Sequence, residues 1–198
     1  MKRRDALKQI GIAAGYVALA PSAFSILQGC TTEVEKWIPQ FLSTDEGSVL
    51  KHLIDLILPK TSASPGALEV NVPEFIDLLA FKSYDDKSQQ KFKEEMEAVV
   101  NELMIDKAPE FLISDLKKEN YDALLHKYLK SKPEDRVNYN EAQELVYSAL
   151  TGIRGTSVWA YRSSQLIGEQ VLPYLPVPGY HKGCIDVNDA TKGKSWAL

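Results

Sequence analysis

The histidines and cysteines are the side chains with which this chain could bind a metal ion. His52, His126 and His181 lie on well-separated segments, and no two of them are spaced four residues apart as on a metal-binding helix. The motifs HExxH and CxxC do not occur. His52 and His126 lie beside apolar helical positions, which is typical of residues at the edge of a core. The sequence therefore indicates no metal site.

Acidic side chains between Lys91 and Glu97 could form an acid–base pair, but their spacing is that of the solvent-facing side of an amphipathic helix. The chain has no GxSxG nucleophile turn, no glycine-rich dinucleotide turn and no phosphate-binding loop. Once a leader that includes Cys30 is set aside, Cys184 is the one remaining cysteine, which excludes a cysteine-ligated iron–sulfur cluster and covalently attached haem. We therefore expect no catalytic residue, cofactor or metal in this chain.

Composition is that of a globular protein with an acidic surface. The 198 residues are 44% apolar and 25% charged, enough for one domain with a core. The formal net charge is −4. Residues 1–29 hold four of the 23 basic and one of the 27 acidic side chains, so the remainder carries −7. A chain this acidic, without a basic stripe, is not expected to bind nucleic acid.

Residues 1–30 have the three parts of an export signal: a basic start, an apolar run over residues 10–27, and small residues before a cysteine. The adjacent Arg3 and Arg4 resemble the twin-arginine motif of bacterial Tat signals. Leu27-Gln28-Gly29-Cys30 resembles a lipobox, in which the cysteine is lipidated and becomes the N-terminus. The sequence predicts a Tat-exported lipoprotein, held by Cys30 on the periplasmic side of a bacterial membrane.

An uncleaved membrane anchor is the alternative interpretation of this leader. The apolar run is at the lower limit for crossing a bilayer, and Gly11, Gly15 and Pro21 weaken it. If Cys30 carries lipid, Cys184 is left without an intramolecular partner in an oxidising compartment. We expect Cys184 to be either buried or bonded to another chain.

The segment from Leu166 to Cys184 differs most from an ordinary helix. Pro173, Pro176 and Pro178 fall within six residues, and proline fixes φ and removes a backbone donor. Pro178-Gly179 indicates a turn. A stiff, extended, aromatic segment loses little chain entropy on docking, which suits a contact surface. The segment could pack on its own domain, bind a partner, or do both.

Helical periodicity dominates the rest of the chain, and no alternating strand pattern, internal repeat or low-complexity tract occurs. Thr44 is the expected N-cap of the first helix, 132–138 is expected to be a loop, and Gly152 and Gly155 are expected to flank a helix end. The predicted helices cover about 44–58, 73–81, 88–107, 120–130, 140–153 and 157–170. We predict an all-α single domain of five or six helices (residues 44–198) with a proline-rich extended C-terminal tail, preceded by a leader (1–30) and a tether (31–43).

Three stretches resemble the gluconate 2-dehydrogenase subunit 3 family. They are the twin-arginine leader, the helix–loop–helix segment ILPKTSASPGALEVNVPEFID, and the ending LPYLPVPGYHKGC. The resemblance implies a small, non-catalytic subunit that supplies the Tat signal and aids maturation of its partner. The partner it implies is a large FAD-containing dehydrogenase of the glucose–methanol–choline type, acting on a sugar, sugar acid or polyol, and a cytochrome c subunit often accepts the electrons.

Under this resemblance the tail is the expected contact with the large subunit. The predicted interface residues are Tyr161, Arg162, Tyr174, Pro178, Gly179, Tyr180 and Cys184. The chain has a predicted Tat signal but no cofactor motif, which fits a subunit that carries the export signal for a cofactor-bearing partner. The alternative explanation of the Tat signal is that this small domain folds too fast to be exported as an unfolded chain. Two further functions remain open, a free-standing periplasmic binding or scaffold lipoprotein and an enzyme in its own right.

Overall fold

The structure, a computed structural model, describes residues 37–175, 177, 179 and 183–197. Arg3, Arg4 and Cys30 of the leader lie outside the described residues, as do Pro178 and Tyr180. The secondary structure in the described part is helical throughout, which confirms the predicted all-α class. No helix in that part is both long and apolar enough to cross a lipid bilayer. The elements are α2 (Thr44–Ile57), η1 (Ala67–Val70), α3 (Val72–Ser83), α4 (Asp86–Met104), η2 (Ile113–Asp115), α5 (Lys118–Leu129), α6 (Pro133–Arg136), α7 (Glu141–Ser163), α8 (Gln165–Gln170) and α9 (Val187–Thr191).

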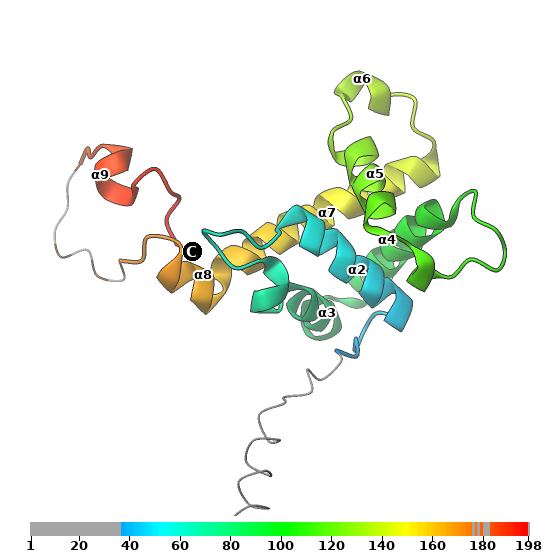
Figure 1. The fold of residues 1–198 in the computed structure, drawn as a ribbon, viewed down its shortest axis with the longest axis horizontal. Coiled ribbons are helices and arrows are strands. Elements are labelled where there is room, and N and C mark those ends of the chain that lie inside the picture. The colour runs from blue at the N-terminus through cyan, green and yellow to red at the C-terminus, as the bar shows by residue number, and fades with distance from the viewer. Residues whose placement is uncertain (1–36, 176, 178, 180–182, 198) are drawn as a thin grey trace, which may run out of the picture. The chain divides into compact units, whose positions relative to one another are not determined.

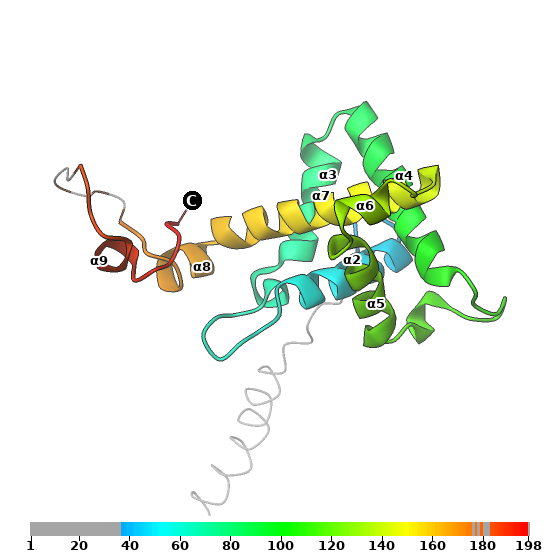
Figure 2. The ribbon, with the colours of Figure 1, turned by 90° about the horizontal axis from the view of Figure 1, so that it is seen from above.

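The long helix α7 is the centre of the helical domain. Helices α2, α3, α4 and α5 all contact it, and α8 continues from its C-terminal end (Figures 1 and 2). Its buried positions recur every three or four residues, so one side of the helix faces the core along most of its length. Those buried residues are Val146, Ala149, Leu150, Ile153, Ser157 and Ala160.

The predicted helix end near Gly152 and Gly155 is wrong, because α7 continues through both glycines to Ser163. A glycine inside a helix costs only about 1 kcal/mol relative to alanine. Burial of the apolar side chains on the core-facing side of α7 outweighs that cost. The structure also contains two short α-helices that were not predicted. Helix α6 lies within the expected loop 132–138, so that prediction is wrong in part, and α9 lies beyond the predicted helices.

The first helix is capped by Ser43, so the predicted N-cap at Thr44 is wrong by one residue. The Ser43 hydroxyl accepts a hydrogen bond from the Glu46 amide at 3.2 Å. The Glu46 carboxylate accepts one from the Ser43 amide at 2.8 Å. This reciprocal capping box pairs two backbone donors that the first turn would otherwise leave without acceptors.

Asp77 on α3 attaches the segment before α2 to the domain. Its carboxylate is buried, with 1% of the residue exposed. It accepts hydrogen bonds from the amides of Gln40 at 2.6 Å, Phe41 at 3.1 Å and Leu42 at 2.9 Å. Leu42 is buried in the core and Phe41 packs against it. Residues 40–42, which the sequence assigns to the tether, are therefore fixed on α3.

Glu102 connects the C-terminal part of α4 to α5. One carboxylate oxygen accepts hydrogen bonds from Lys127 Nζ at 2.6 Å and from the Tyr128 hydroxyl at 2.7 Å. Burial pushes the pKa of Glu102 upward, but the hydrogen bonds from Lys127 and Tyr128 outweigh burial and leave that pKa below its ordinary value. The ionised carboxylate therefore stabilises the contact between these two helices.

Replacing Asp77 with alanine tests the attachment of residues 40–42. We expect the free energy of unfolding to fall by about 2–4 kcal/mol, because three backbone amides lose a charged acceptor and two of them are in or beside the core. Urea denaturation monitored by circular dichroism measures this loss. The matched control is Asp122→Ala on the exposed side of α5, which should change stability by less than about 0.5 kcal/mol. Equal effects for the two variants would contradict the role of Asp77.

Glu102→Gln should lower the free energy of unfolding by about 1 kcal/mol at neutral pH, a value discounted for partial solvent screening. Because the folded-state pKa lies below the unfolded value, the stabilisation is present above the ordinary value of 4.5 and is lost as pH falls through the folded-state pKa. The difference between wild type and variant should therefore shrink in acid. Denaturation series across acidic pH measure it, with Glu97→Gln on the exposed side of α4 as the control.

Candidate partner interface

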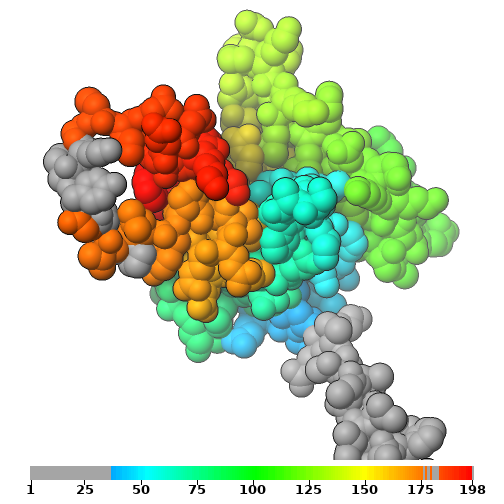
Figure 3. All heavy atoms as spheres, turned by 60° about the vertical axis from the view of Figure 1, so that its left-hand side comes forward, coloured from blue at the N-terminus to red at the C-terminus, as the bar shows by residue number. Residues whose placement is uncertain are grey.

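The chain after α8 folds back on itself and forms a closed arm, defined as the described residues of the segment 171–197. The Ala197 amide donates a hydrogen bond to the Pro173 carbonyl at 3.2 Å. The Lys194 ammonium donates to the Val171 carbonyl at 2.8 Å. These contacts join the two ends of the arm, and the C-terminal segment lies against α8 (Figure 3).

Helix α9 gives the returning half of the arm its own local structure. The Asp186 carboxylate caps α9 by accepting from the Asn188 amide at 2.8 Å. Thr191 is buried, and its hydroxyl donates to the Val187 carbonyl. Lys192 and Gly193 both have positive φ angles, of 53° and 77°, which turn the chain back toward α8 after α9. The arm is therefore a loop that is fixed at its base.

Large apolar side chains project from this arm into solvent. Tyr174 and Leu175 are each 54% exposed. Monomeric soluble proteins rarely keep a group of such side chains on one projecting segment unless it contacts another molecule. The exposed apolar residues of the arm are Tyr174, Leu175, Val177, Ile185, Val187 and Trp196.

Arg162 is a predicted interface residue that attaches the arm to α7. Its Nη2 donates a hydrogen bond to the Trp196 carbonyl at 3.0 Å, and the side chain is half-buried. No hydrogen-bond partner for the buried Arg162 Nε is found among the described residues. Arg162 is thus positioned at the base of the arm, where it fixes the C-terminal segment.

Tyr161 is the second predicted interface residue on α7, and it is engaged within the domain. Its hydroxyl donates to the Pro65 carbonyl at 2.7 Å, and its ring packs against the core. Tyr161 therefore holds the loop between α2 and η1, which is the Pro-Gly-Ala loop on which the family resemblance partly rests. A Cβ on Gly66 would lie 2.7 Å from the Lys60 backbone nitrogen, so only glycine fits at this point of the loop.

The same loop is stabilised by Glu69. Its carboxylate accepts hydrogen bonds from the Lys60 ammonium and, at 2.7 Å, from the Gly66 amide. The hydrogen bond from Lys60, followed by that from the Gly66 amide, lowers the pKa of Glu69. Glu69 on η1 therefore joins Lys60 near the start of the loop to Gly66 at its end, and Tyr161 of α7 holds Pro65 beside Gly66.

Cys184 and Gly179 both lie on the arm. Cys184 is exposed and is not in a disulfide. The expectation that Cys184 is buried in its own domain is therefore wrong, and the expected bond to another chain stays a prediction. The φ angle of Gly179 is +71°, which explains the glycine in the predicted turn. Tyr174, Gly179 and Cys184 thus share the arm, Arg162 supports it from α7, and Tyr161 holds the loop before η1 instead.

A hollow of about 240 Å³ lies between α3, α4 and α7. Its polar lining consists of Tyr84, Ser88, Lys91, Glu95 and Thr156. Glu95 accepts a hydrogen bond from Ser148 at 2.8 Å and lies 3.7 Å from Lys91 Nζ. Burial, together with the nearby Glu95 carboxylate, raises the pKa of Tyr84. The Glu95 carboxylate of the hollow is therefore already paired, with Lys91 in the lining and with Ser148 beside it.

No group of three or more His, Cys, Asp and Glu side chains suited to a metal ion occurs within the part of the chain that the structure describes. Sequence reasoning also missed part of the arm. Ile185, Val187 and Trp196 follow the proline-rich segment in a polar stretch, and only the return of the chain to Pro173 brings them onto the same arm as Tyr174. The one available signal was the presence of isolated large apolar residues near a chain end.

The sequence matches the family described as gluconate 2-dehydrogenase subunit 3 over residues 44–179. The match includes the helical domain, the Pro-Gly-Ala loop and the first part of the arm. The leader and the residues from Tyr180 onward lie outside it. No curated protein and no solved structure matches the chain. Because the match covers well over half of its length, this chain belongs to the gluconate 2-dehydrogenase subunit 3 family.

Proposed function

We propose that this chain is the non-catalytic small subunit of a membrane-associated, FAD-dependent dehydrogenase. The partner is a large flavoprotein of the glucose–methanol–choline type that oxidises a sugar, sugar acid or polyol. The small subunit supplies the Tat export signal through Arg3 and Arg4, and Cys30 carries the lipid that holds the complex on the periplasmic side of the membrane. Family membership supports the subunit role, since the family name denotes a subunit of a dehydrogenase.

The arm is the observation that supports a contact with a larger partner. It presents Tyr174, Leu175 and Trp196 on a loop whose base is fixed by Arg162. A contact segment that is already ordered loses less conformational entropy on binding than a free tail does. Aromatic side chains are enriched among the residues that contribute most to protein–protein binding. We therefore assign the arm to the large subunit.

Cys184 gives the arm a chemically distinct group. Its thiol is exposed, and the proposed compartment is oxidising. A disulfide to a cysteine of the large subunit would form with loss of two electrons and two protons to the oxidant of that compartment. Electrophoresis of the complex with and without reductant distinguishes a covalent contact from a non-covalent one.

Purification of the complex from native membranes tests the proposed function. The small subunit should bring down a much larger protein with the visible absorption bands of oxidised flavin, and sugar-dependent reduction of a dye should follow that protein. A cytochrome c subunit would add haem bands to the spectrum. A small subunit that is recovered alone would contradict the proposal and favour a free-standing scaffold lipoprotein. Sugar turnover by the isolated chain would favour an enzyme in its own right.

Exposed side chains of the arm allow a direct test of the contact. In the double variant Tyr174→Ser and Leu175→Ser we expect at least about a tenfold loss of co-purified flavoprotein, because such contact residues often contribute 2 kcal/mol or more to binding. The matched control replaces Ile105 and Val137, which are also exposed and apolar, with serine. Thermal unfolding should be nearly unchanged in both variants. If both double variants lost the same amount of co-purified flavoprotein, the loss would reflect a more polar surface in general. That result would contradict the contact through the arm.

A further inference from the structure

The side of α3 that faces away from the core is apolar. Ile76, Asp77 and Ala80 point into the domain and are buried. The opposite side carries Phe75, Leu78 and Phe81, which are 40%, 43% and 42% exposed. A helix that is apolar on both sides is normally covered on both sides.

Helix α7 extends this apolar surface. The ring of Trp159, which is itself about half exposed, lies 5.6 Å from the ring of Phe75, measured between centroids. We call Phe75, Leu78, Phe81 and Trp159 the outer α3 face. Four large side chains on adjoining helices make a larger apolar surface than isolated exposed residues do, which indicates a contact with another phase or molecule.

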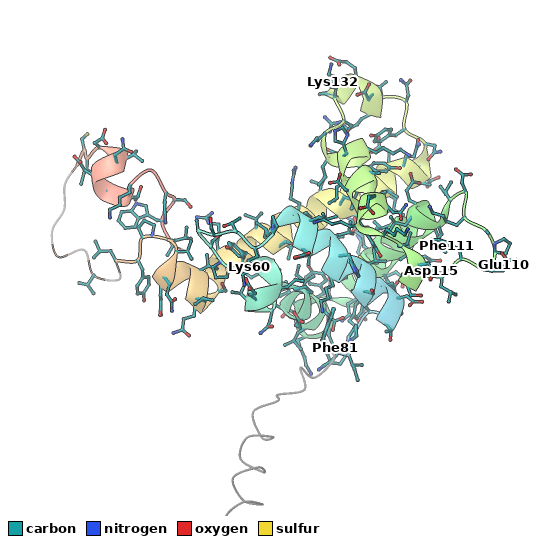
Figure 4. All side chains as sticks on the ribbon, viewed as in Figure 1. Lys60, Phe81, Glu110, Phe111, Asp115 and Lys132 are labelled. Carbon is teal, nitrogen blue, oxygen red and sulfur yellow. The ribbon has the colours of Figure 1, made fainter. Side chains whose placement is uncertain are left out.

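The N-terminal segment of the domain joins it at α3. Asp77, which holds the amides of residues 40–42, lies one helical turn before Phe81, so Phe81 is at the border between the buried and the exposed side of α3. In Figure 4, Phe81 lies at the lower edge of the domain, the edge at which the segment before α2 joins it in Figure 1. Ile38, just before this segment, is 78% exposed. The attachment point of the N-terminal chain and the outer α3 face therefore lie on one side of the domain.

Chain length limits how far this side can be from an anchor at Cys30. Seven residues lie between Cys30 and Ile38, so the two are eight residue steps apart. A fully extended chain spans at most about 3.6 Å per residue, so Ile38 can be no more than about 29 Å from a lipidated Cys30. That distance is no more than the diameter of a small domain, about 30 Å. It favours an orientation in which the side of the domain at which residues 38–42 attach faces the bilayer.

The side chains of the outer α3 face suit the boundary between headgroups and acyl chains. Tryptophan and other aromatic side chains favour this boundary. Lys82 Nζ lies 4.5 Å from the centroid of the Phe81 ring. A lysine in that position can bury its methylene chain beside apolar groups and keep its ammonium among the headgroups. Because the chain after residue 29 carries a net charge of −7, attraction must come from apolar burial more than from anionic lipids.

We propose that the outer α3 face rests on the lipid bilayer, so that Phe75, Leu78, Phe81 and Trp159 insert at the level of the headgroups. This inference rests on the lipid anchor in the proposed function. The lipid holds the chain near the membrane, and the outer α3 face then fixes its orientation. The arm remains available to the large subunit.

Quenching by lipids that carry a nitroxide tests this orientation. The full-length lipidated chain is reconstituted into phosphatidylcholine vesicles with a fluorescent label at Phe81→Cys. The matched control carries the label at Val137→Cys, which is 84% exposed in the native chain. Both variants also carry Cys184→Ser so that one thiol is labelled. We expect quenching by headgroup-proximal nitroxide lipids to be at least about threefold stronger at position 81. Equally weak quenching at both positions would overturn the inference.

Flotation with the vesicles separates failure of the anchor from failure of the inference. The lipidated chain should float and Cys30→Ser should not. If the lipidated chain floats but position 81 is not quenched, the anchor stands and the outer α3 face is not a membrane surface. If the lipidated chain does not float, the proposed anchor fails and the inference fails with it.

Two other molecules could cover the outer α3 face: the large flavoprotein and a second copy of this chain. Measurements on the native complex test the first, and the oligomeric state tests the second. Quenching at position 81 that is lost when the large flavoprotein is bound would assign the outer α3 face to that protein and overturn the inference. A dimer in detergent, detected by sedimentation, in which the label at position 81 is shielded would assign the face to a second copy. A second measurement avoids a label: Trp37 and Trp196 are replaced with phenylalanine, so that Trp159 is the one tryptophan. In this background the double variant Phe75→Ser and Leu78→Ser should reduce the quenching of Trp159 fluorescence by nitroxide lipids.

Discussion

Burial of one side of α7 is the interaction on which the rest of this structure depends. Val146, Leu150 and Ile153 pack in the core, and the same side continues through Ser157 to Ala160. Because the buried side of α7 is continuous, the helix continues across Gly152 and Gly155 and extends through the domain. Its first half is a core helix, and its last turns carry Tyr161 and Arg162, from which the loop before η1 and the arm are held. One helix therefore connects the hydrophobic core to the candidate interface.

Asp77 has a related function on the other side of the domain. A buried carboxylate is costly unless its oxygens are hydrogen-bonded, and here three consecutive backbone amides supply those bonds. The result is a fixed junction between the helical domain and the chain that leads to Cys30. The junction fixes the place on the helical domain at which residues 40–42 attach. In the proposed lipid-anchored state, this attachment point determines which side of the domain lies nearest to Cys30.

Membership of the gluconate 2-dehydrogenase subunit 3 family and the surface of the domain support the same view of function. In the hollow between α3, α4 and α7 the Glu95 carboxylate is paired with Lys91 and Ser148, while large apolar side chains are exposed on the arm and on the outer α3 face. A surface that is built in this way is suited to holding other molecules in place. We propose two surfaces with different occupants: the arm for the large subunit and the outer α3 face for lipid.

Much of the fold and part of the site could be predicted from residue types and spacing. Helical periodicity, caps and prolines are local properties, so the all-α class and the approximate places of α2, α3, α4 and α5 follow from short stretches of sequence. Two predictions were wrong because the local sequence favours more than one outcome at those positions. Gly152 and Gly155 favour a break, and Thr44 and Ser43 are both good caps, so neighbouring packing and hydrogen bonding decided the outcome.

The sequence by itself determined the helical class, the family and the presence of an unusual apolar, proline-rich ending, and it predicts a leader. Only the tertiary structure decided that Tyr161 supports a loop, that Arg162 holds the arm, that residues far from the prolines join that arm, and that Asp77 fixes the N-terminal segment to α3. The physical reason is the range of the interactions. Propensity and capping act over a few residues, whereas these contacts join segments that are from about 24 to 96 residues apart in the chain.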